Sequence, residues 1–365
     1  MAFAVDQATH DGLARARAGQ RAIDRRAWLV TAVAGAVALA FAAAILLYDN
    51  PAAPGSAAQA TVTKLRATTL AAIALVAAAQ GVATAVFHTV CGNRVITPSI
   101  MGFDALHSLV QTATVFFFGA AALGAGGVWR SVGQCAGMAL FAVALYGWLL
   151  GRPGLTVRVA LLVGLVLGLA FRAAATLMQR LLNPSDFDLV TARLFGNMSN
   201  ADTRFLPLGA ALAAGALALV WSRRRHLDLA ALGSATARGL GLNHRREVML
   251  ALLAVSGLIA VATTLVGPMT FFGFLAASLT YRLAPGARHA RLLPAIAAVA
   301  AAVLLAAYFT LRHVFYAGGL ISVVIEFVGG LFFLAHLLKG PTRGNTRLIR
   351  QSRGQPAIRR EQAGD

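Results

Sequence analysis

Lysine is almost absent from this sequence. Lys64 is followed by Leu65 and Lys339 by Gly340, and these are the only two lysines. A GxxxxGKS/T phosphate-binding loop needs a lysine followed by serine or threonine, so the chain is not a P-loop ATPase by itself. Charge as a whole is also scarce, because only 12% of the residues are charged, about half the share of a typical soluble domain.

Cysteine and catalytic motifs are equally rare. Cys91 and Cys135 lie in or beside apolar runs, without a CxxC pattern or a Cys/His pair, so a zinc or disulfide framework is not expected. We interpret both as packing residues. No HExxH motif occurs, and the nearest match to a GxSG serine site, AVSG at residues 254–257, is interpreted as a small-residue packing position. We expect no catalytic residue, no bound metal and no cofactor.

Long apolar runs dominate what is present. Hydrophobic residues make up 58% of the chain, and its mean hydropathy is +0.72. A bilayer core about 30 Å thick needs roughly 20 apolar residues for each helix, and the runs supply about ten such helices. They are continuous instead of alternating with period two, which disfavours a barrel. The sequence therefore predicts an all-α, polytopic membrane protein with about ten transmembrane helices.

The arginines set the predicted orientation. They concentrate in residues 1–27, 223–246 and 339–365, as expected for cytoplasmic segments. The formal net charge of +19 would otherwise suggest phosphate binding, but this distribution argues against nucleic acid as a partner. Both termini are predicted to be cytoplasmic, with 1–27 as a basic arm and 339–365 as a disordered basic tail that contacts anionic membrane lipid.

The transmembrane part is predicted to cover residues 28–338. Its first apolar run is long enough to span and follows a long polar arm, so it is not expected to be a cleaved signal. The segment after the fifth span contains Pro184, Asp186 and Asp188 and is predicted to form a short amphipathic helix on the outer surface. The ten predicted spans are 28–48, 67–91, 97–119, 128–150, 155–178, 204–222, 247–266, 269–284, 292–311 and 319–338. The segments between them are too short for an independent core, so an ATPase or a substrate-capturing module must be a separate chain.

The stretch GNRVITPSIMGFDALHSLVQT, residues 92–112, is unusually polar for this chain. Its Thr97 and Pro98 are typical of a helix start. Four polar residues share one helix face, because they follow at i, i+3, i+4 and i+7: Asp104, His107, Ser108 and Gln111. Such a face is costly in lipid. It is either the polar wall of a translocation path or a set of hydrogen bonds between helices.

Three further polar residues are candidates for the same path. Asn93 and Arg94 lie at the expected cytoplasmic turn before the polar face. Glu326 lies well inside the last span, where it faces the path or a dimer centre, or bonds to a neighbouring helix. A faint internal repeat, PSIMGF at 98–103 and PMTFFGF at 268–274, is of the kind found at matching positions of transporters built from inverted repeats.

Residues 228–244 read DLAALGSATARGLGLNH. Alanine and leucine dominate the first half, which predicts a helix, and Gly239 and Gly241 end it. A short helix outside the membrane suits docking into a groove on another protein, although the pattern also fits a plain loop helix.

These segments resemble the FecCD-type permease subunits of bacterial ABC importers for iron-siderophores, haem and vitamin B12, and most of all the branch that takes up catecholate-type siderophores. The resemblance runs from Trp28 to Gly340. It rests on five blocks in the family's order: NRVITPSIMGFDAL (93–106), LGSATARGLGL (232–242), LVGPMTFFGFLAASLTYRL (265–283), RHARLLP (288–294) and GGLISVVIEFVGGLFFLAHLL (318–338).

The resemblance implies a type II ABC importer permease fold with inverted repeats in the bacterial inner membrane. Two permease subunits, as a heterodimer or a homodimer, would pair around a path for a ferric siderophore. Two P-loop ATPase subunits would bind inside and an extracytoplasmic siderophore-binding protein outside. The residues implied to couple to the ATPase are Leu232, Gly233, Ser234, Ala235, Ala237, Arg238, Gly239, Leu240 and Gly241.

The resemblance also implies that Arg66 and Arg312 dock the binding protein. The family's LRxPR pattern reads LRATT at residues 65–69, so its second arginine is missing here.

Other classes of function stay open. An autonomous proton- or cation-driven secondary transporter needs ion-coupling carboxylates in several spans, and the well-buried candidates are Asp104 and Glu326. An intramembrane enzyme needs paired catalytic groups, for which the sequence offers only Asp104 with His107. A permease for a related chelate, such as haem or vitamin B12, is a further alternative.

Overall fold

The computed structural model describes residues 2–49, 53, 55–122, 127–151, 157–194, 203–315 and 321–338. Within these ranges the chain forms helices and no β-strand, as predicted. The helices are α1 (Ala2–Leu47), α2 (Ala57–Cys91), η1 (Pro98–Met101, a 3-10 helix), α3 (Phe103–Phe118), α5 (Gly127–Gly151), α6 (Val157–Arg180), α7 (Pro184–Leu194), α8 (Leu206–Ser222), α9 (Arg224–Ala230), α10 (Ser234–Gly239), α11 (His244–Val266), α12 (Phe272–Leu283), α13 (His289–His313) and α14 (Ile321–Leu338).

Each of the ten predicted spans corresponds to one of these helices. In chain order they are α1, α2, α3, α5, α6, α8, α11, α12, α13 and α14. Six helices in the described part of the chain are long and apolar enough to cross a membrane on their own, and seven if the bent pair of α8 and α9 is one span. Among the remaining predicted spans, α3 and α12 are shorter helices because of two breaks in the chain, described below, and α14 has 18 residues.

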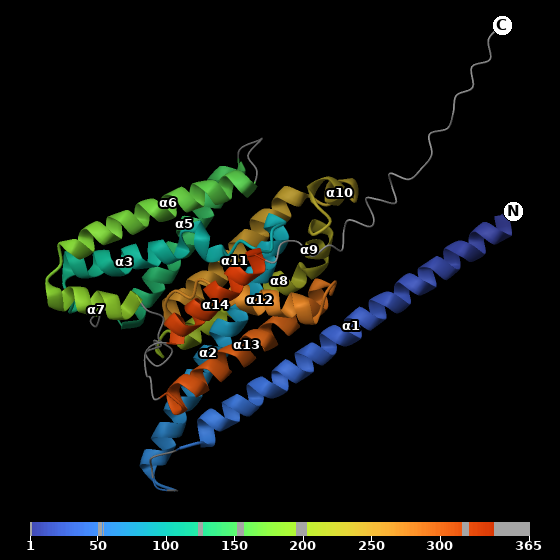
Figure 1. Cartoon of the computed structure of the whole chain (residues 1–365). Coiled ribbons are helices and arrows are strands. Elements are labelled where there is room, and N and C mark those ends of the chain that lie inside the picture. Colours follow the sequence, from blue (N-terminus) through green and yellow to red (C-terminus); the bar gives the residue numbers. More distant parts are fainter. Residues whose placement is uncertain are drawn as a thin grey trace.

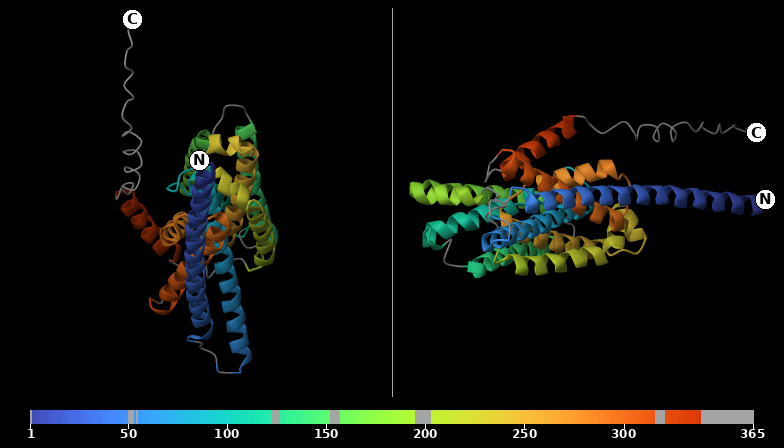
Figure 2. Two further views of the ribbon diagram at one scale, coloured as in Figure 1. Left: turned by 90° about the vertical axis from the view of Figure 1, so that its right-hand side faces the viewer. Right: turned by 90° about the horizontal axis from the view of Figure 1, so that it is seen from below.

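Helix α1 is much longer than the first predicted span. It begins at Ala2 instead of residue 28, so the basic arm continues the apolar helix without a break. Alanine and arginine both favour helix, whereas a prediction of spans considers hydropathy alone. Helix α1 packs along α13, and Arg26 Nε donates a hydrogen bond of 2.7 Å to the Leu283 carbonyl. The amino-terminal part of α1 extends past the bundle (Figure 1, Figure 2).

Helices α2 and α11 form the centre of the bundle (Figure 1). In each of them, 72% of the most apolar window is buried. Helix α2 contacts α11, α12 and α13. Small residues permit this close approach, since a Cβ added to Gly81 would lie 2.9 Å from Cγ2 of Ile296. Such van der Waals packing is the main source of helix association in lipid.

The third predicted span is interrupted near its start. Residues 98–101 form η1, Gly102 takes a left-handed backbone with φ of 93°, and α3 begins only at Phe103. The prediction of a helix start at Thr97 was therefore wrong for the α-helix. Thr97 precedes η1, but its side chain makes no capping hydrogen bond.

This first break fits into a glycine groove on α6. A Cβ on Gly168 would lie 3.0 Å from Cα of Gly102, and a Cβ on Gly164 would lie 3.1 Å from the Met101 carbonyl oxygen. Gly164 and Gly168 are one helical turn apart and leave the groove open, as in other small-xxx-small contacts. Both the positive φ and the backbone contact therefore require glycine at position 102.

A second break precedes α12. Gly267 ends α11 with φ of 99°, and α12 begins at Phe272. A Cβ on Gly273 would collide with the Thr84 hydroxyl of α2. Helices α3 and α12 have 16 and 12 residues, so they are about 24 Å and 18 Å long, both less than a bilayer core of about 30 Å. The two similar sequences thus share a local structure, a break followed by a short helix.

Helix α7 confirms the helix predicted after the fifth span. It begins at Pro184, a residue suited to the first helical turn. Val190 of α7 is fully buried against Val115, so α7 packs on α3. The tail predicted at 339–365 lies outside the described residues.

Candidate functional site

The two breaks in the chain meet at a buried carboxylate. Asp104, in the first turn of α3, is 7% exposed, and its Oδ2 accepts a hydrogen bond of 2.8 Å from the Thr270 hydroxyl. Thr270 belongs to the second break, just before α12. Because the amino-terminal end of a helix carries a partial positive charge, the starts of α3 and α12 form a favourable environment for a negative group.

Glu326 of α14 lies at the same place. This residue is half-buried, and its carboxyl lies close enough to the Thr270 backbone and to Asp104 to interact with both. Ser99 of η1 and Arg172 of α6 also interact with Asp104. Two acidic residues that the sequence placed in different spans are therefore close neighbours.

A chain of hydrogen bonds continues from α3 to α5. His107 Nδ1 lies 2.5 Å from Nε2 of Gln134. Gln111 Nε2 donates to Oε1 of Gln134 at 3.0 Å, and Gln111 Oε1 in turn accepts from Nη1 of Arg130 at 3.0 Å. His107, Gln111 and Gln134 are each at most 6% exposed. Buried polar groups require such partners, so these side chains fix α5 against α3.

Three of the predicted path residues do not join this network. The Ser108 hydroxyl donates to the carbonyl four residues earlier in its own helix. Asn93 Oδ1 accepts from the backbone two residues later, which is a local turn. Arg94 is exposed, and its guanidinium carbon lies 4.5 Å from the centre of the Tyr281 ring.

Hydrogen bonding between elements therefore accounts for part of the polar face. Asp104, His107 and Gln111 each contact a residue outside α3. Together with Glu326 they form a polar region across α3, α5 and α14 within an otherwise apolar bundle. Within the described ranges, no three His, Cys, Asp or Glu side chains are grouped to hold a metal ion.

Residues 223–246 form a compact projection between α8 and α11, which we call the α9–α10 projection. The single helix predicted for its first half is instead two helices, because the turn at 231–233 separates α9 from α10. Gly233 and Gly241 adopt φ of 92° and 82°, which glycine permits without strain. Gly239, predicted as a breaker, is the last residue of α10.

The α9–α10 projection has a small core and an exposed outer face. Ala230, Ala237 and Leu242 pack together, whereas Leu232 and Leu240 are 57% and 59% exposed. Exposed leucines held on short helices are suited to an interaction surface. Of the other predicted coupling residues, Ala237 is buried in this small core. The rest are exposed: Gly233, Ser234, Ala235, Arg238, Gly239 and Gly241.

An ion pair closes the base of the α9–α10 projection. Arg223 Nη1 lies 3.0 Å from Oε1 of Glu247, with side chains 27% and 7% exposed. Arg223 immediately precedes α9, and Glu247 lies in the first turn of α11. The two ends of the projection are therefore held together.

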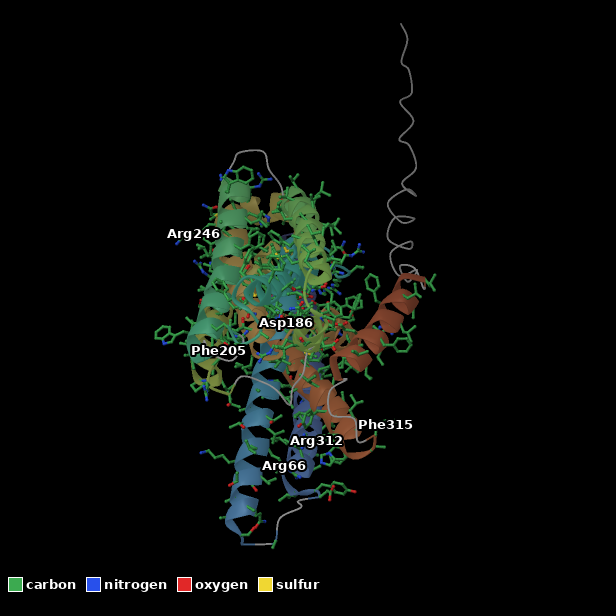
Figure 3. The ribbon with its side chains drawn as sticks, turned by 90° about the vertical axis from the view of Figure 1, so that its left-hand side faces the viewer. Arg66, Asp186, Phe205, Arg246, Arg312 and Phe315 are labelled. Carbon is green, nitrogen blue, oxygen red and sulfur yellow. The ribbon has the colours of Figure 1, made fainter. Side chains whose placement is uncertain are left out.

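Arg66 and Arg312 lie near each other and away from Arg246 of the arginine-rich segment (Figure 3). Arg66 is already engaged, since its guanidinium donates to the carbonyls of Tyr48 at 2.7 Å and Asp49 at 2.8 Å. The last carbonyls of a helix lack partners within the helix. Arg66 therefore caps the carboxyl-terminal end of α1.

Arg312 is more available for a partner. It is exposed, and its Nη1 donates one hydrogen bond of 3.2 Å to the Tyr308 hydroxyl of its own helix. Of the two predicted docking arginines, Arg312 thus presents its charge to the surface, while the guanidinium of Arg66 is occupied by hydrogen bonds to the end of α1.

Comparison with known proteins agrees with this arrangement. Residues 25–339 match the FecCD transport family over most of the chain. The chain belongs to the FecCD transport family. Among family relatives, the petrobactin import system permease protein FatC of Bacillus anthracis is 35% identical over 316 residues, covering 86% of this chain and 89% of FatC. The petrobactin import system permease protein YclO of Bacillus subtilis is 31% identical over 273 residues, covering 74% and 86%.

Two further comparisons concern the breadth of the FecCD family and its fold. The vitamin B12 import system permease protein BtuC of Serratia proteamaculans is 29% identical over 324 residues, covering 86% of this chain and 93% of BtuC. A solved structure described as an inward-facing conformation of a metal-chelate type ABC transporter superposes with a TM-score of 0.70 and 19% identity. The superposition covers 86% of this chain and 99% of the chain in the solved structure. The predicted permease fold is confirmed.

The polar region of this FecCD family member includes residues that sequence reasoning missed. Arg130 and Gln134 are polar residues inside an apolar run, and that signal was available because such residues are rare in spans. Thr270 gave no comparable signal, since threonine is common in membrane helices. Its contact with Asp104 becomes visible only in three dimensions.

Proposed function

We propose that this chain is the permease subunit of an ABC importer that moves a ferric siderophore across the bacterial inner membrane. A separate subunit hydrolyses ATP. The observation that carries this proposal is the compact α9–α10 projection, with its exposed leucines, on a FecCD fold that has no nucleotide-binding loop. The cargo is inferred from FatC and YclO, which are named as permeases of petrobactin import systems.

The α9–α10 projection is the proposed docking site for the ATPase. Leu232 and Leu240 stand out from a small packed core, and a short helix with apolar residues fits a groove on a partner. The arginines of residues 223–246 support a cytoplasmic position for this end of the bundle. Both termini are then cytoplasmic, with 1–27 as an arm, 28–338 as the permease domain and 339–365 as a basic tail near lipid.

The polar region around Asp104 and Glu326 is proposed to border the path together with His107, Ser108 and Gln111. A second permease subunit, a related chain or a copy of this one, supplies the other wall. Asn93 and Arg94 are proposed to flank its inner mouth. A ferric chelate must be released after transport, so weak polar contacts suit this path. High affinity then belongs to the extracytoplasmic binding protein, whose acidic residues meet Arg312 and, in part, Arg66.

Uptake in cells tests the cargo and the energy source. The chain is expressed with its ATPase, binding protein and second permease in a strain that lacks other siderophore permeases, and radioactive iron is supplied as the petrobactin chelate. We expect uptake that stops when the ATPase nucleotide-binding lysine is replaced. Uptake that continues with the inactive ATPase and follows the proton gradient would instead establish a secondary transporter. Uptake of vitamin B12 or haem without uptake of the iron chelate would establish a different cargo.

Co-purification tests the docking surface. We expect the double substitution Leu232→Ser and Leu240→Ser to abolish capture of the ATPase. The matched control is Leu47→Ser with Leu65→Ser, since these leucines are 80% and 60% exposed near the connection between α1 and α2. Equal capture by both double variants would contradict docking on the α9–α10 projection.

A further inference from the structure

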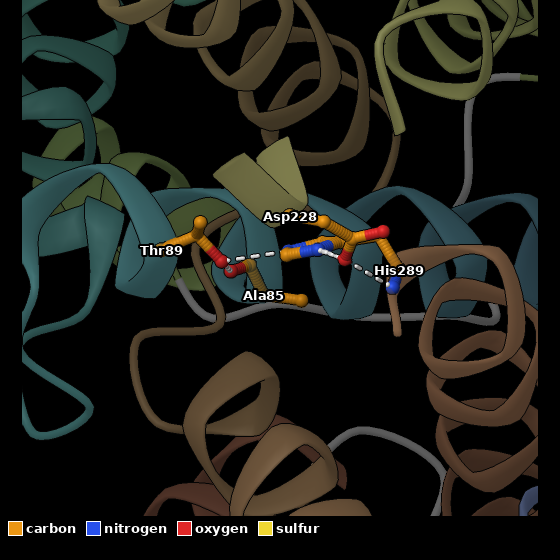
Figure 4. A network of polar contacts seen from close by, with 4 residues as sticks. All are labelled: Ala85, Thr89, Asp228 and His289. Carbon is orange, nitrogen blue, oxygen red and sulfur yellow. Dashed lines mark hydrogen bonds and ion pairs between the residues drawn. The ribbon is translucent and has the colours of Figure 1, made fainter. Parts of the chain in front are cut away.

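His289 joins three helices at the base of the α9–α10 projection (Figure 4). It is the first residue of α13 and is 4% exposed. Its Nδ1 lies 2.6 Å from Oδ1 of Asp228 in α9, and its backbone N–H donates to the same oxygen at 2.9 Å. On the other side, its Nε2 lies 2.8 Å from the Thr89 hydroxyl of α2.

The Asp228 carboxylate gives the direction of one of these bonds. An ionised carboxylate only accepts, so Nδ1–H donates to Asp228. On the other side of the ring, the Thr89 hydroxyl lies within hydrogen-bond distance of His289 Nε2, at 2.8 Å, and of the Ala85 carbonyl oxygen, at 3.0 Å. The ring therefore bridges the Asp228 carboxylate on one side and the Thr89 hydroxyl on the other.

The charge on Asp228 is consistent with this pairing. Burial alone would raise the pKa of its carboxyl, but the hydrogen bonds from His289 and the charges of His289 and Arg288 lower the pKa below the ordinary value. The carboxylate is then ionised at neutral pH. A charge-assisted bond of this kind is roughly twice as strong as one between neutral groups.

The position of Asp228 makes this contact a polar attachment of α9 to the bundle. The neighbouring Leu227 is 2% exposed and packs into the core, and α9 contacts α2, α8, α10, α11 and α13. Helix α10, by contrast, contacts α9 and α11. A displacement of α10 by a docked partner therefore reaches α13 through α9, and α2 through both α9 and α11.

We propose that Asp228, His289 and Thr89 are positioning residues that form a coupling link, which transmits movement of the α9–α10 projection to α13 and α2. The inference rests on the proposed function, because it needs an ATPase docked on the projection. One carboxylate oxygen holds both the His289 ring and the His289 backbone, so movement of α9 moves the start of α13 itself. Helices that touch only through apolar side chains can slide past each other. The hydrogen bonds of Asp228 and His289 are directional, so they fix the position of α9 on the start of α13.

The test compares ATP hydrolysis with transport in the assembled importer. Asp228→Asn, His289→Gln and Thr89→Val are each purified with the ATPase and second permease, reconstituted in vesicles, and supplied with binding protein and radioactive ferric petrobactin. We expect the ATPase to co-purify in normal amounts and hydrolysis to continue. Iron uptake per ATP hydrolysed should fall about tenfold, within the usual range of coupling between sites.

Matched controls separate coupling from folding. Thr89→Ser keeps the hydroxyl and should behave as the unaltered protein. Asp24→Asn removes a carboxylate on α1 whose side-chain partner is Gln20 of the same helix and should also couple normally. The double variant Asp228→Asn with His289→Gln should lose no more coupling than either single variant, because the effects of substitutions within one link are not additive.

The outcomes are distinguishable from those of the proposed function. If the unaltered chain neither captures an ATPase nor carries iron, the proposed function fails. If it does both and His289→Gln and Thr89→Val retain full uptake per ATP hydrolysed, the coupling link is overturned while the proposed function stands. If His289→Gln fails to assemble, the coupling link is tested by comparing uptake per ATP hydrolysed between Thr89→Val and Thr89→Ser, because neither substitution alters α9.

Discussion

The hydroxyl of Thr270 donates a hydrogen bond of 2.8 Å to Oδ2 of Asp104, a residue 166 positions earlier in the chain. This bond joins the break before α3 to the break before α12. It holds the starts of two short helices around a carboxylate in an apolar bundle. The bond therefore contributes both to stability and to the chemistry of the polar region.

Loss of the Thr270 hydroxyl should destabilise the bundle. Thr270→Val keeps the shape of the side chain but leaves a buried carboxylate oxygen without its donor, which costs about 1–3 kcal/mol. We expect a lower midpoint of thermal unfolding in detergent, whereas Thr270→Ser restores it. An unchanged midpoint for Thr270→Val would show that the carboxylate finds another partner.

The glycine groove on α6 should tolerate no side chain. In Gly168→Ala the new Cβ would lie 3.0 Å from Cα of Gly102, and both partners are backbone. Overpacking of this kind costs about 1–3 kcal/mol, measurable as a lower yield of monodisperse protein and a lower unfolding midpoint. Gly137→Ala in α5 is the control, because a Cβ there meets nothing within 4 Å; equal losses for both would refute a role for the groove.

The two docking arginines should behave differently when replaced by glutamine. Arg66→Gln removes the hydrogen bonds to the carbonyls at the end of α1 and should lower the unfolding midpoint. Arg312→Gln should leave the midpoint unchanged and weaken docking of the binding protein, measured by surface plasmon resonance, by about 1.4–5-fold for one exposed ion pair. A stable Arg66→Gln protein would contradict the capping role.

The ion pair at the base of the α9–α10 projection should limit its opening. Glu247→Gln leaves the Arg223 guanidinium without its carboxylate. We expect faster amide hydrogen exchange across residues 224–243, because local opening requires this contact to break. The exchanged pair, Arg223→Glu with Glu247→Arg, should recover part of the protection. If amide exchange is unchanged in Glu247→Gln, the ion pair does not limit opening of the α9–α10 projection.

Protonation of Asp228 should weaken its contact with His289 only at low pH. The pKa of its carboxyl is lowered from the ordinary value of 3.8, so its stabilising contribution is fully present above that value and is lost as pH falls through the folded pKa. The difference in unfolding midpoint between the unaltered chain and Asp228→Asn should therefore be constant from about pH 6 down to about pH 4. A difference that disappears near pH 5 would show that the pKa is not lowered.

The spans were predictable because apolar runs in lipid have few alternatives to helix. The ends of the helices were less predictable than the spans. The α3 start depends on Gly102 fitting against α6, a contact between distant parts of the chain, and hydropathy cannot register it. Likewise, the start of α1 at Ala2 reflects helix propensity in a polar arm, which a search for apolar windows ignores.

Part of the candidate site was predictable for a similar reason. Asp104 and Glu326 stand out because a carboxylate inside a span is costly. Their closeness to Thr270, and the pairing of His289 with Asp228, are set by how α3, α9, α12, α13 and α14 pack. Spacing along one helix gives no information about such partners, so they became apparent only in the folded chain.

The closed base of the α9–α10 projection has a consequence for the speed and strength of association. A flexible loop must lose conformational entropy when a partner orders it, about 1–2 kcal/mol for each residue fixed. The Arg223–Glu247 pair and the packed Ala230, Ala237 and Leu242 have already ordered this segment. A partner then meets a nearly rigid surface, so more of the contact energy remains as affinity and the complex forms without a folding step.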